Sequence, residues 1–211
     1  MNPVPVSVAT DDGLVLEGEW LAAEAAFASI VLCHPHPQYG GSMRSIVTSA
    51  LFDALPRRQI SCLRFNFRGV EGSEGEHAGG RGETRDVHAA IEWVTARSAH
   101  PIVLSGWSFG ADMALCVADP VLRGWVAIAP PLRFRAADDY GAVARDPRPK
   151  LLELAANDEF RAPAEIEAET KDWANTRRET IAGASHFFVG RTERVVELTA
   201  GFVREVAGSP G

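Results

Sequence analysis

The sequence predicts an α/β fold, with a mostly parallel sheet of about eight strands flanked by helices in a single domain over residues 1–211. Three observations support this prediction. Short runs rich in Val, Ile and Leu alternate with stretches of helical periodicity, which is typical of strand–helix units around a parallel sheet. The chain has 211 residues, a length typical of one domain with one core. No internal repeat and no linker-like stretch divides it.

The strands are predicted from short apolar or alternating runs bounded by turn residues. The first two flank Asp11-Asp12-Gly13, which is a turn sequence, and are expected to form a hairpin. The other six are short apolar runs of the kind found in buried strands. The strands are expected at residues 4–10, 14–21, 29–33, 61–67, 102–105, 125–129, 151–155 and 179–181.

The helices are predicted from apolar residues spaced three and four apart. The first is expected to end before Pro56, because proline cannot continue a helix. The third begins directly after the strand at 102–105, and the fourth is acidic and amphipathic. The helices are expected at residues 43–55, 87–94, 109–117, 164–173 and 195–206.

Composition limits the class of protein and its partners. The 21 Lys and Arg and 28 Asp and Glu give a formal charge of −7, and no basic block occurs, so neither nucleic acid nor membrane is an expected partner. Cys33, Cys62 and Cys116 cannot all pair and lie in apolar stretches, so they are interpreted as reduced core residues. No apolar run is long enough to cross a membrane. We therefore expect a cytoplasmic protein with a small-molecule substrate. Its oligomeric state is open, and a homodimer is one option.

A candidate nucleophile lies in Gly106-Trp107-Ser108-Phe109-Gly110. An apolar strand ends at Ser105 and a helical pattern starts at Phe109, which is the context of a nucleophile elbow. A sharp turn of this kind brings the residues two before and two after the serine against neighbouring backbone, so both positions need glycine. Ser108 is therefore predicted to be the catalytic nucleophile.

A serine nucleophile needs a base, and the base needs an acid that orients it. His186 follows the last expected strand and is the only histidine after His100, so it is predicted to be the base. Asp158 follows the strand at 151–155 and is the predicted acid. Glu159 and Asp112 are the alternatives, and Asp112 is less suited because it lies within the helix that follows Ser108.

The segment His34-Pro35-His36-Pro37 follows the third expected strand. Pro35 and Pro37 have no N–H, so the amide of His36 is a candidate for one half of an oxyanion hole, with the amide of Phe109 as the other half. His34, Tyr39 and Trp107 are expected to line the substrate pocket. A metal site at His34 and His36 is an alternative, but Gln38 and Tyr39 stand where a His-x-His-x-Asp-His zinc motif needs Asp and His. No metal or cofactor is expected.

Two loops bear on the size of the substrate. The segment Arg68–Glu83 contains six glycines and is expected to lie on the surface and to roof part of the pocket. The segment Pro130–Pro149 is polar and has no sustained apolar face, so no helical lid is expected. An open, shallow pocket that favours short acyl chains follows from this prediction.

These motifs resemble the α/β-hydrolase superfamily, and in particular small bacterial hydrolases that carry His-Pro-His-Pro, two glycines and a methionine, here His34 to Met43. Dienelactone-hydrolase-like and dipeptidyl-peptidase-like enzymes are broader relatives. The resemblance implies the triad Ser108, Asp158 and His186. Where those relatives usually have Asp-Asn after the methionine, this chain has Arg44-Ser45.

The predicted function is hydrolysis of a small carboxylic ester, thioester or amide through an acyl-serine intermediate, most simply as a carboxylesterase. A protein of the same fold that binds a ligand without catalysis is an alternative, because fold does not fix function. A metal-dependent hydrolase using His34 and His36 is the other alternative.

Overall fold

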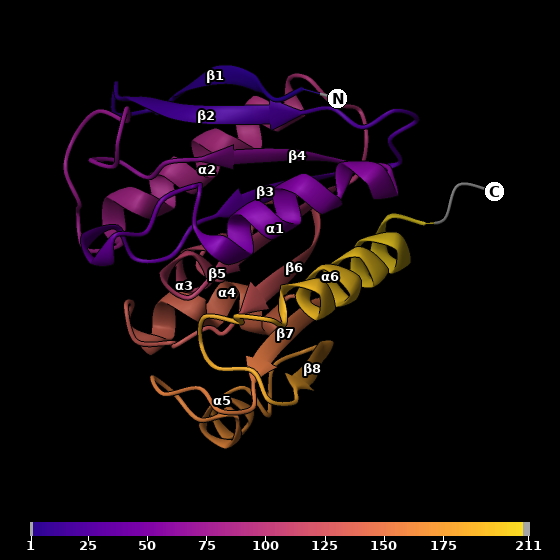
Figure 1. Ribbon diagram of the computed structural model, residues 1–211. Coiled ribbons are helices and arrows are strands. Elements are labelled where there is room, and N and C mark those ends of the chain that lie inside the picture. The colour runs from indigo at the N-terminus through magenta and orange to yellow at the C-terminus, as the bar shows by residue number, and fades with distance from the viewer. Residues whose placement is uncertain (1, 209–211) are drawn as a thin grey trace.

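The computed structural model describes residues 2–208, and its centre is one eight-stranded sheet (Figure 1). The order of the strands across the sheet is β1-β2-β4-β3-β5-β6-β7-β8. Strands β1 and β2 are antiparallel, β2 is antiparallel to β4, and all other neighbours are parallel. The strands are β1 (Val4–Ala9), β2 (Val15–Leu21), β3 (Ala28–Cys33), β4 (Ile60–Phe65), β5 (Ile102–Trp107), β6 (Leu122–Ile128), β7 (Lys150–Ala155) and β8 (Thr176–Ile181).

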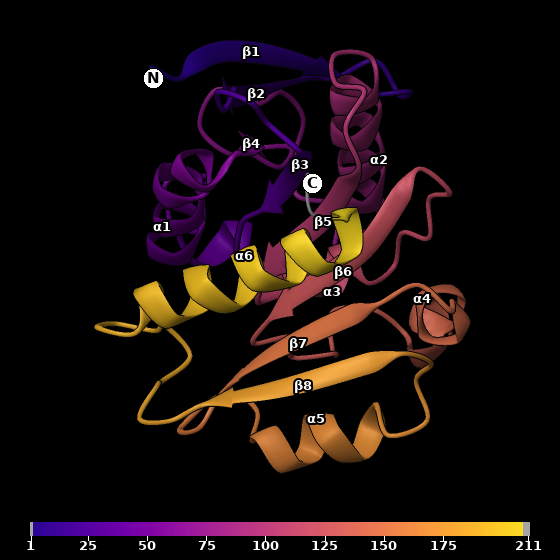
Figure 2. The same ribbon diagram turned by 90° about the vertical axis from the view of Figure 1, so that its right-hand side faces the viewer.

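Helices cover both faces of this sheet, as the two views in Figures 1 and 2 show. Helices α1 and α6 pack together on one face, and α2 and α3 pack on the other. The α-helices are α1 (Ile46–Ala54), α2 (Arg81–Thr95), α3 (Phe109–Ala114), α4 (Gly141–Arg145), α5 (Pro163–Glu169) and α6 (Thr192–Ala207). Short 3₁₀ helices occur at η1 (Pro37–Tyr39), η2 (Pro56–Arg58) and η3 (Ala137–Tyr140).

The two faces bury separate apolar clusters because successive strand residues point to opposite sides. In β3, Val31 contributes to the cluster under α2 and α3, while Ile30 and Leu32 contribute to the cluster under α1 and α6. All six residues of β3 and all six of β5 are buried. The parallel strands are therefore held rigidly, and their carboxyl ends present the loops at one edge of the sheet. The predicted fold class is confirmed.

Some expected boundaries are wrong. Strand β8 begins at Thr176 rather than Glu179. It is an edge strand that pairs only with β7, and edge strands often carry charged residues, here Arg177 and Arg178. The apolar pattern used for the prediction therefore missed its first residues. Helix α3 ends at Ala114 rather than near Val117. Between β6 and β7 the chain forms only η3 and the five-residue helix α4. The absence of a helical lid in this segment is confirmed.

Most residues between the ends of Arg68–Glu83 lie on the surface, as expected, but both ends of the segment are buried. The side chain of Arg68 is buried and donates to Asp86 Oδ1 at 2.7 Å and to Asp12 Oδ2 at 2.9 Å. Glu83 is buried inside the first turn of α2, and its carboxylate accepts the N–H groups of Ala78 and Gly80. The loop is thus anchored at both ends. Within residues 2–208, no helix has both the length and the apolar character that crossing a membrane requires.

Candidate active site

Ser108 lies at a sharp turn between β5 and α3. Its φ of 55° is in the left-handed region, which is strained for any residue except glycine. A Cβ on Gly106 would lie 2.1 Å from the carbonyl oxygen of Gly110, and a Cβ on Gly110 would lie 2.4 Å from that of Cys33. Both obstacles are backbone atoms, so neither can move aside. The two glycines allow the turn that places Ser108 at the carboxyl edge of the sheet, in the wall of a cavity.

His186 lies in the loop between β8 and α6, and its side chain reaches Ser108. The distance from His186 Nε2 to Ser108 Oγ is 2.9 Å, and the imidazole is almost fully buried. Two further contacts hold the backbone of His186. Trp107 Nε1 donates to its carbonyl oxygen at 3.1 Å, and its N–H donates to Glu159 Oε2 at 3.0 Å. The imidazole is therefore positioned by groups on both sides of its loop.

Asp158 lies in the loop after β7 and contacts the other nitrogen of the same imidazole. Its Oδ2 is 2.8 Å from His186 Nδ1. Its Oδ1 accepts the N–H groups of Phe160 at 2.9 Å and Arg161 at 3.2 Å. These amides orient the carboxylate, so Oδ2 faces the imidazole. The structure thus brings Ser108, His186 and Asp158 into one hydrogen-bonded row.

The two alternative acids occupy other places. Glu159 accepts the backbone N–H of His186 and does not contact its ring nitrogens. Asp112 is fully buried, and its carboxylate accepts the N–H groups of Leu132 at 2.8 Å, Arg133 at 2.9 Å and Phe134 at 3.0 Å. Burial raises the pKa of Asp112 to about 6. Asp112 therefore ties α3 to the loop after β6.

The two predicted oxyanion-hole amides follow the carboxyl ends of the neighbouring strands β3 and β5. His36 precedes η1, and its carbonyl oxygen accepts from Tyr39 and Gly41, so the chain turns tightly around it. Phe109 is the first residue of α3, where a backbone N–H has no acceptor within the helix. Within residues 2–208, neither the His36 nor the Phe109 N–H donates to another backbone or side-chain group. The ring centroids of the two residues lie 4.8 Å apart.

His34 does not line the cavity beside Ser108, so that expectation is wrong. It is fully buried; its Nε2 accepts the N–H of Phe67 at 3.0 Å, and its Nδ1 is 2.6 Å from the carbonyl oxygen of Pro35. Burial lowers its pKa to about 4, so the ring is neutral. Both nitrogens are engaged: Nε2 ties the end of β3 to the loop after β4, and Nδ1 contacts the loop that carries His34. This leaves no free lone pair on His34 for a metal shared with His36.

A cavity of about 570 Å³ opens beside Ser108 and His186. Trp107 and Tyr39 line it as expected, and most of the wall is aromatic or otherwise apolar. No residue of Arg68–Glu83 is among the lining residues in the described chain, so the expectation that this loop roofs the pocket is wrong. The lining residues are Pro35, His36, Tyr39, Gly40, Gly41, Ser45, Ile46, Trp107, Ser108, Arg133, Phe134, Phe160, His186 and Phe187.

Several of these lining residues were not predicted from the sequence. Arg133, Phe134 and Phe160 lie in irregular segments after β6 and β7, and Phe187 follows His186. Their only common signal is position, because each comes shortly after a strand that ends at the same edge of the sheet. Arg44, where the resembling hydrolases differ, does not line this cavity.

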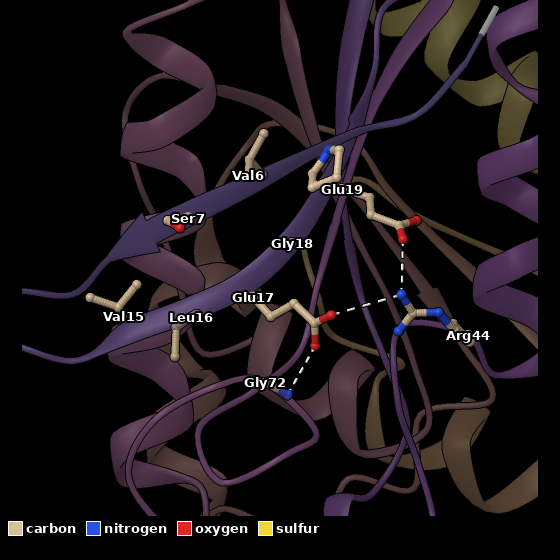
Figure 3. Close-up of a pocket in the computed structure, with 10 residues that line it drawn as sticks. Val6, Ser7, Val15, Leu16, Glu17, Gly18, Glu19, Arg44 and Gly72 are labelled. Atoms are coloured by element: carbon tan, nitrogen blue, oxygen red, sulfur yellow. Dashed lines mark hydrogen bonds and ion pairs between the residues drawn. The ribbon is translucent and has the colours of Figure 1, made fainter.

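A second hollow of about 420 Å³ lies along β1 and β2 (Figure 3). Arg44 pairs there with Glu19 at 2.9 Å and approaches Glu17 at 3.8 Å, and Glu17 accepts the N–H of Gly72. Its charged groups thus satisfy one another. None of the predicted site residues lines it.

The chain is similar to known proteins over most of its length. It is 32% identical over 189 residues to the uncharacterized protein RP471 of Rickettsia prowazekii, which covers 84% of this chain and 79% of that protein. An alpha-beta serine hydrolase homologue from Coxiella burnetii superposes with a TM-score of 0.86 at 29% identity, over 96% of this chain and 98% of that one.

A second solved structure is similar in the same way. The protein XC6422 of Xanthomonas campestris, described as a serine hydrolase without a lid, superposes with a TM-score of 0.85 at 26% identity, over 100% of this chain and 98% of that one. The model of the alpha/beta hydrolase family matches residues 30–200, which include Ser108, Asp158 and His186. The chain belongs to the alpha/beta hydrolase family.

Proposed function

We propose that this protein is a serine hydrolase that cleaves small carboxylic esters or thioesters through an acyl-serine intermediate. The observation that carries the proposal is the row of hydrogen bonds from Ser108 Oγ through His186 to Asp158, at 2.9 and 2.8 Å. A serine hydroxyl is a weak nucleophile until a neighbouring base removes its proton. This row supplies the base and the carboxylate that orients it.

Each group has a defined role in the proposed reaction. His186 Nε2 takes the proton of Ser108 as Oγ attacks the carbonyl carbon, and the carboxylate of Asp158 stabilises the imidazolium that forms. The amides of His36 and Phe109 donate to the oxygen that becomes negative in the tetrahedral intermediate. His186 then protonates the departing alcohol or thiol. A water molecule, deprotonated by the same imidazole, then attacks the acyl carbon; the bond to Ser108 Oγ breaks, the acid is released, and His186 returns the proton to Oγ.

A fluorophosphonate probe tests this function, because it forms a covalent bond only with an activated serine. Wild-type protein is expected to be labelled at Ser108, and both Ser108→Ala and His186→Ala are expected to lose labelling while their circular dichroism spectra stay unchanged. Turnover of acetyl esters and thioesters by the same samples links labelling to catalysis. Equal labelling of wild type and Ser108→Ala would refute the assignment. A wild-type protein that takes no label would instead be a ligand-binding protein of this fold.

A further inference from the structure

The cavity beside Ser108 has an unusual balance of charge. The chain carries a formal charge of −7, yet none of the fourteen described residues that line the cavity is acidic. Arg133 is the one Lys or Arg among them. The wall is otherwise mainly aromatic and apolar, so the positive charge of Arg133 has no carboxylate among the described lining residues to neutralise it.

The guanidinium of Arg133 has no ion-pair partner among residues 2–208, unlike its neighbours. Arg135 pairs with Asp139 at 2.9 Å, and Arg161 pairs with Glu169. Arg133 instead lies 5.3 Å from the ring centroid of Phe134 and 5.8 Å from that of Phe160. The side chain of Arg133 is exposed, its guanidinium lies over two rings of the cavity wall, and its N–H groups have no acceptor among the described residues.

The backbone that carries Arg133 is also fixed. Asp112, inside the helix that begins after Ser108, accepts the N–H groups of Leu132, Arg133 and Phe134. The positive charge is near enough to His36 to contribute to lowering its pKa, together with burial, which is the larger cause. The backbone of Arg133 is thus held at the cavity wall, and its charge lies near the loop that carries the His36 amide.

We propose that Arg133 binds an anionic group of the substrate, so that the preferred esters carry a carboxylate beside a planar apolar part. This inference rests on the proposed function. A guanidinium donates two parallel hydrogen bonds to a carboxylate, and this geometry gives both affinity and orientation. The surrounding aromatic rings favour a flat group over a long flexible chain. Arg133 would thus add selection for an anionic substrate to the hydrolase fold.

The test compares hydrolysis of matched anionic and neutral esters. One pair carries the charge on the leaving group: 4-acetoxybenzoate and its neutral methyl ester. The other carries it on a planar acyl group: monomethyl terephthalate and methyl 4-methylbenzoate. Wild type is expected to have the higher kcat/KM for the anionic member of at least one pair, and that pair tells which side of the scissile bond faces Arg133.

Variants at two arginines separate local binding from overall charge. Arg133→Gln is expected to lower the ratio of anionic to neutral kcat/KM about tenfold, mainly through KM, because one charge-assisted contact is lost. Arg133→Glu is expected to invert the preference. Arg123→Gln removes the same charge from β6, outside the cavity, and is expected to leave the ratio unchanged. Added salt should reduce the wild-type ratio.

Labelling of Ser108 and hydrolysis of neutral esters distinguish failure of this inference from failure of the proposed function. If Ser108 takes the fluorophosphonate label and neutral esters are hydrolysed, but Arg133→Gln changes both members of each pair equally, the inference is wrong and the hydrolase function stands. The same holds if wild type prefers the neutral member of both pairs. If Ser108 takes no label and no ester is hydrolysed, the proposed function fails and the inference fails with it.

Discussion

Replacing Asp158 with Asn is expected to inactivate the proposed site for a reason that the local hydrogen bonds supply. Oδ1 of Asp158 accepts two backbone N–H groups, from Phe160 and Arg161, at 2.9 and 3.2 Å. In Asp158→Asn only the amide oxygen can take that place. The NH₂ group must then face His186 Nδ1, which becomes an acceptor and leaves the ring proton on Nε2. An imidazole protonated at Nε2 cannot accept the proton of Ser108.

The size of the effect follows from the loss of the correct tautomer. An isosteric amide at the acid of a Ser-His-Asp row lowers kcat by about 10⁴, equivalent to about 5.4 kcal/mol in the barrier. Glu159→Gln is the matched control, because it keeps an oxygen that can accept the His186 N–H and alters no contact of the ring. Its kcat is expected to stay within about tenfold of wild type.

Steady-state hydrolysis of 4-nitrophenyl acetate gives kcat for both variants, and thermal unfolding checks that each variant is folded. A second control, Asp112→Asn, removes a buried carboxylate that contacts neither Ser108 nor His186. If Glu159→Gln loses more activity than Asp158→Asn in folded protein, the reasoning on tautomers is refuted and Glu159 is the acid.

Three further predictions concern stability and chain length. Glu153 is fully buried, and burial raises its pKa to about 8. Between about pH 4.5 and pH 8 the native protein therefore keeps a proton on Glu153 that the unfolded protein loses. The free energy of unfolding falls as pH rises through this interval. Glu153→Gln removes this loss. Its free energy of unfolding in urea, relative to wild type, is expected to increase over that interval by about 5 kcal/mol. Equal pH dependence in both proteins would contradict the assignment. Gly110→Ala places a Cβ 2.4 Å from a backbone oxygen and is expected to lower the free energy of unfolding by at least about 2 kcal/mol. Gly201→Ala on α6 is the control, because its Cβ meets nothing within 4 Å. It is expected to be neutral or stabilising in the same assay. Without a helical lid, methylenes beyond the cavity stay in water and forgo about 0.8 kcal/mol each, so kcat/KM is expected to be highest for short acyl esters; a steady rise from acetyl to dodecanoyl would show that long chains are buried.

The spacing of particular residues was enough to predict much of this protein. Gly106 and Gly110 around Ser108, after an apolar strand, predicted a strained turn because only glycine fits against the backbone there, and the structure shows that close approach. The order of Ser108, Asp158 and His186 along alternating strands and helices predicted that all three lie at one edge of a parallel sheet. Local sterics and the period of the hydrophobic pattern act over a few residues, so they can be recognised without a structure.

Other features depend on groups that are distant in sequence, and only the tertiary structure decided them. Asp158 and Glu159 are adjacent carboxylates, and which one meets the imidazole depends on the amides of the turn that orients them. His34 is buried against Phe67, because the loop after β4 needs an acceptor for its N–H. Asp112, which is buried, fixes the backbone of Arg133 in the cavity wall through a hydrogen bond across about twenty residues of chain. Sequence periodicity carries no information on such contacts, because the satisfaction of buried polar groups is settled only when the loops pack together.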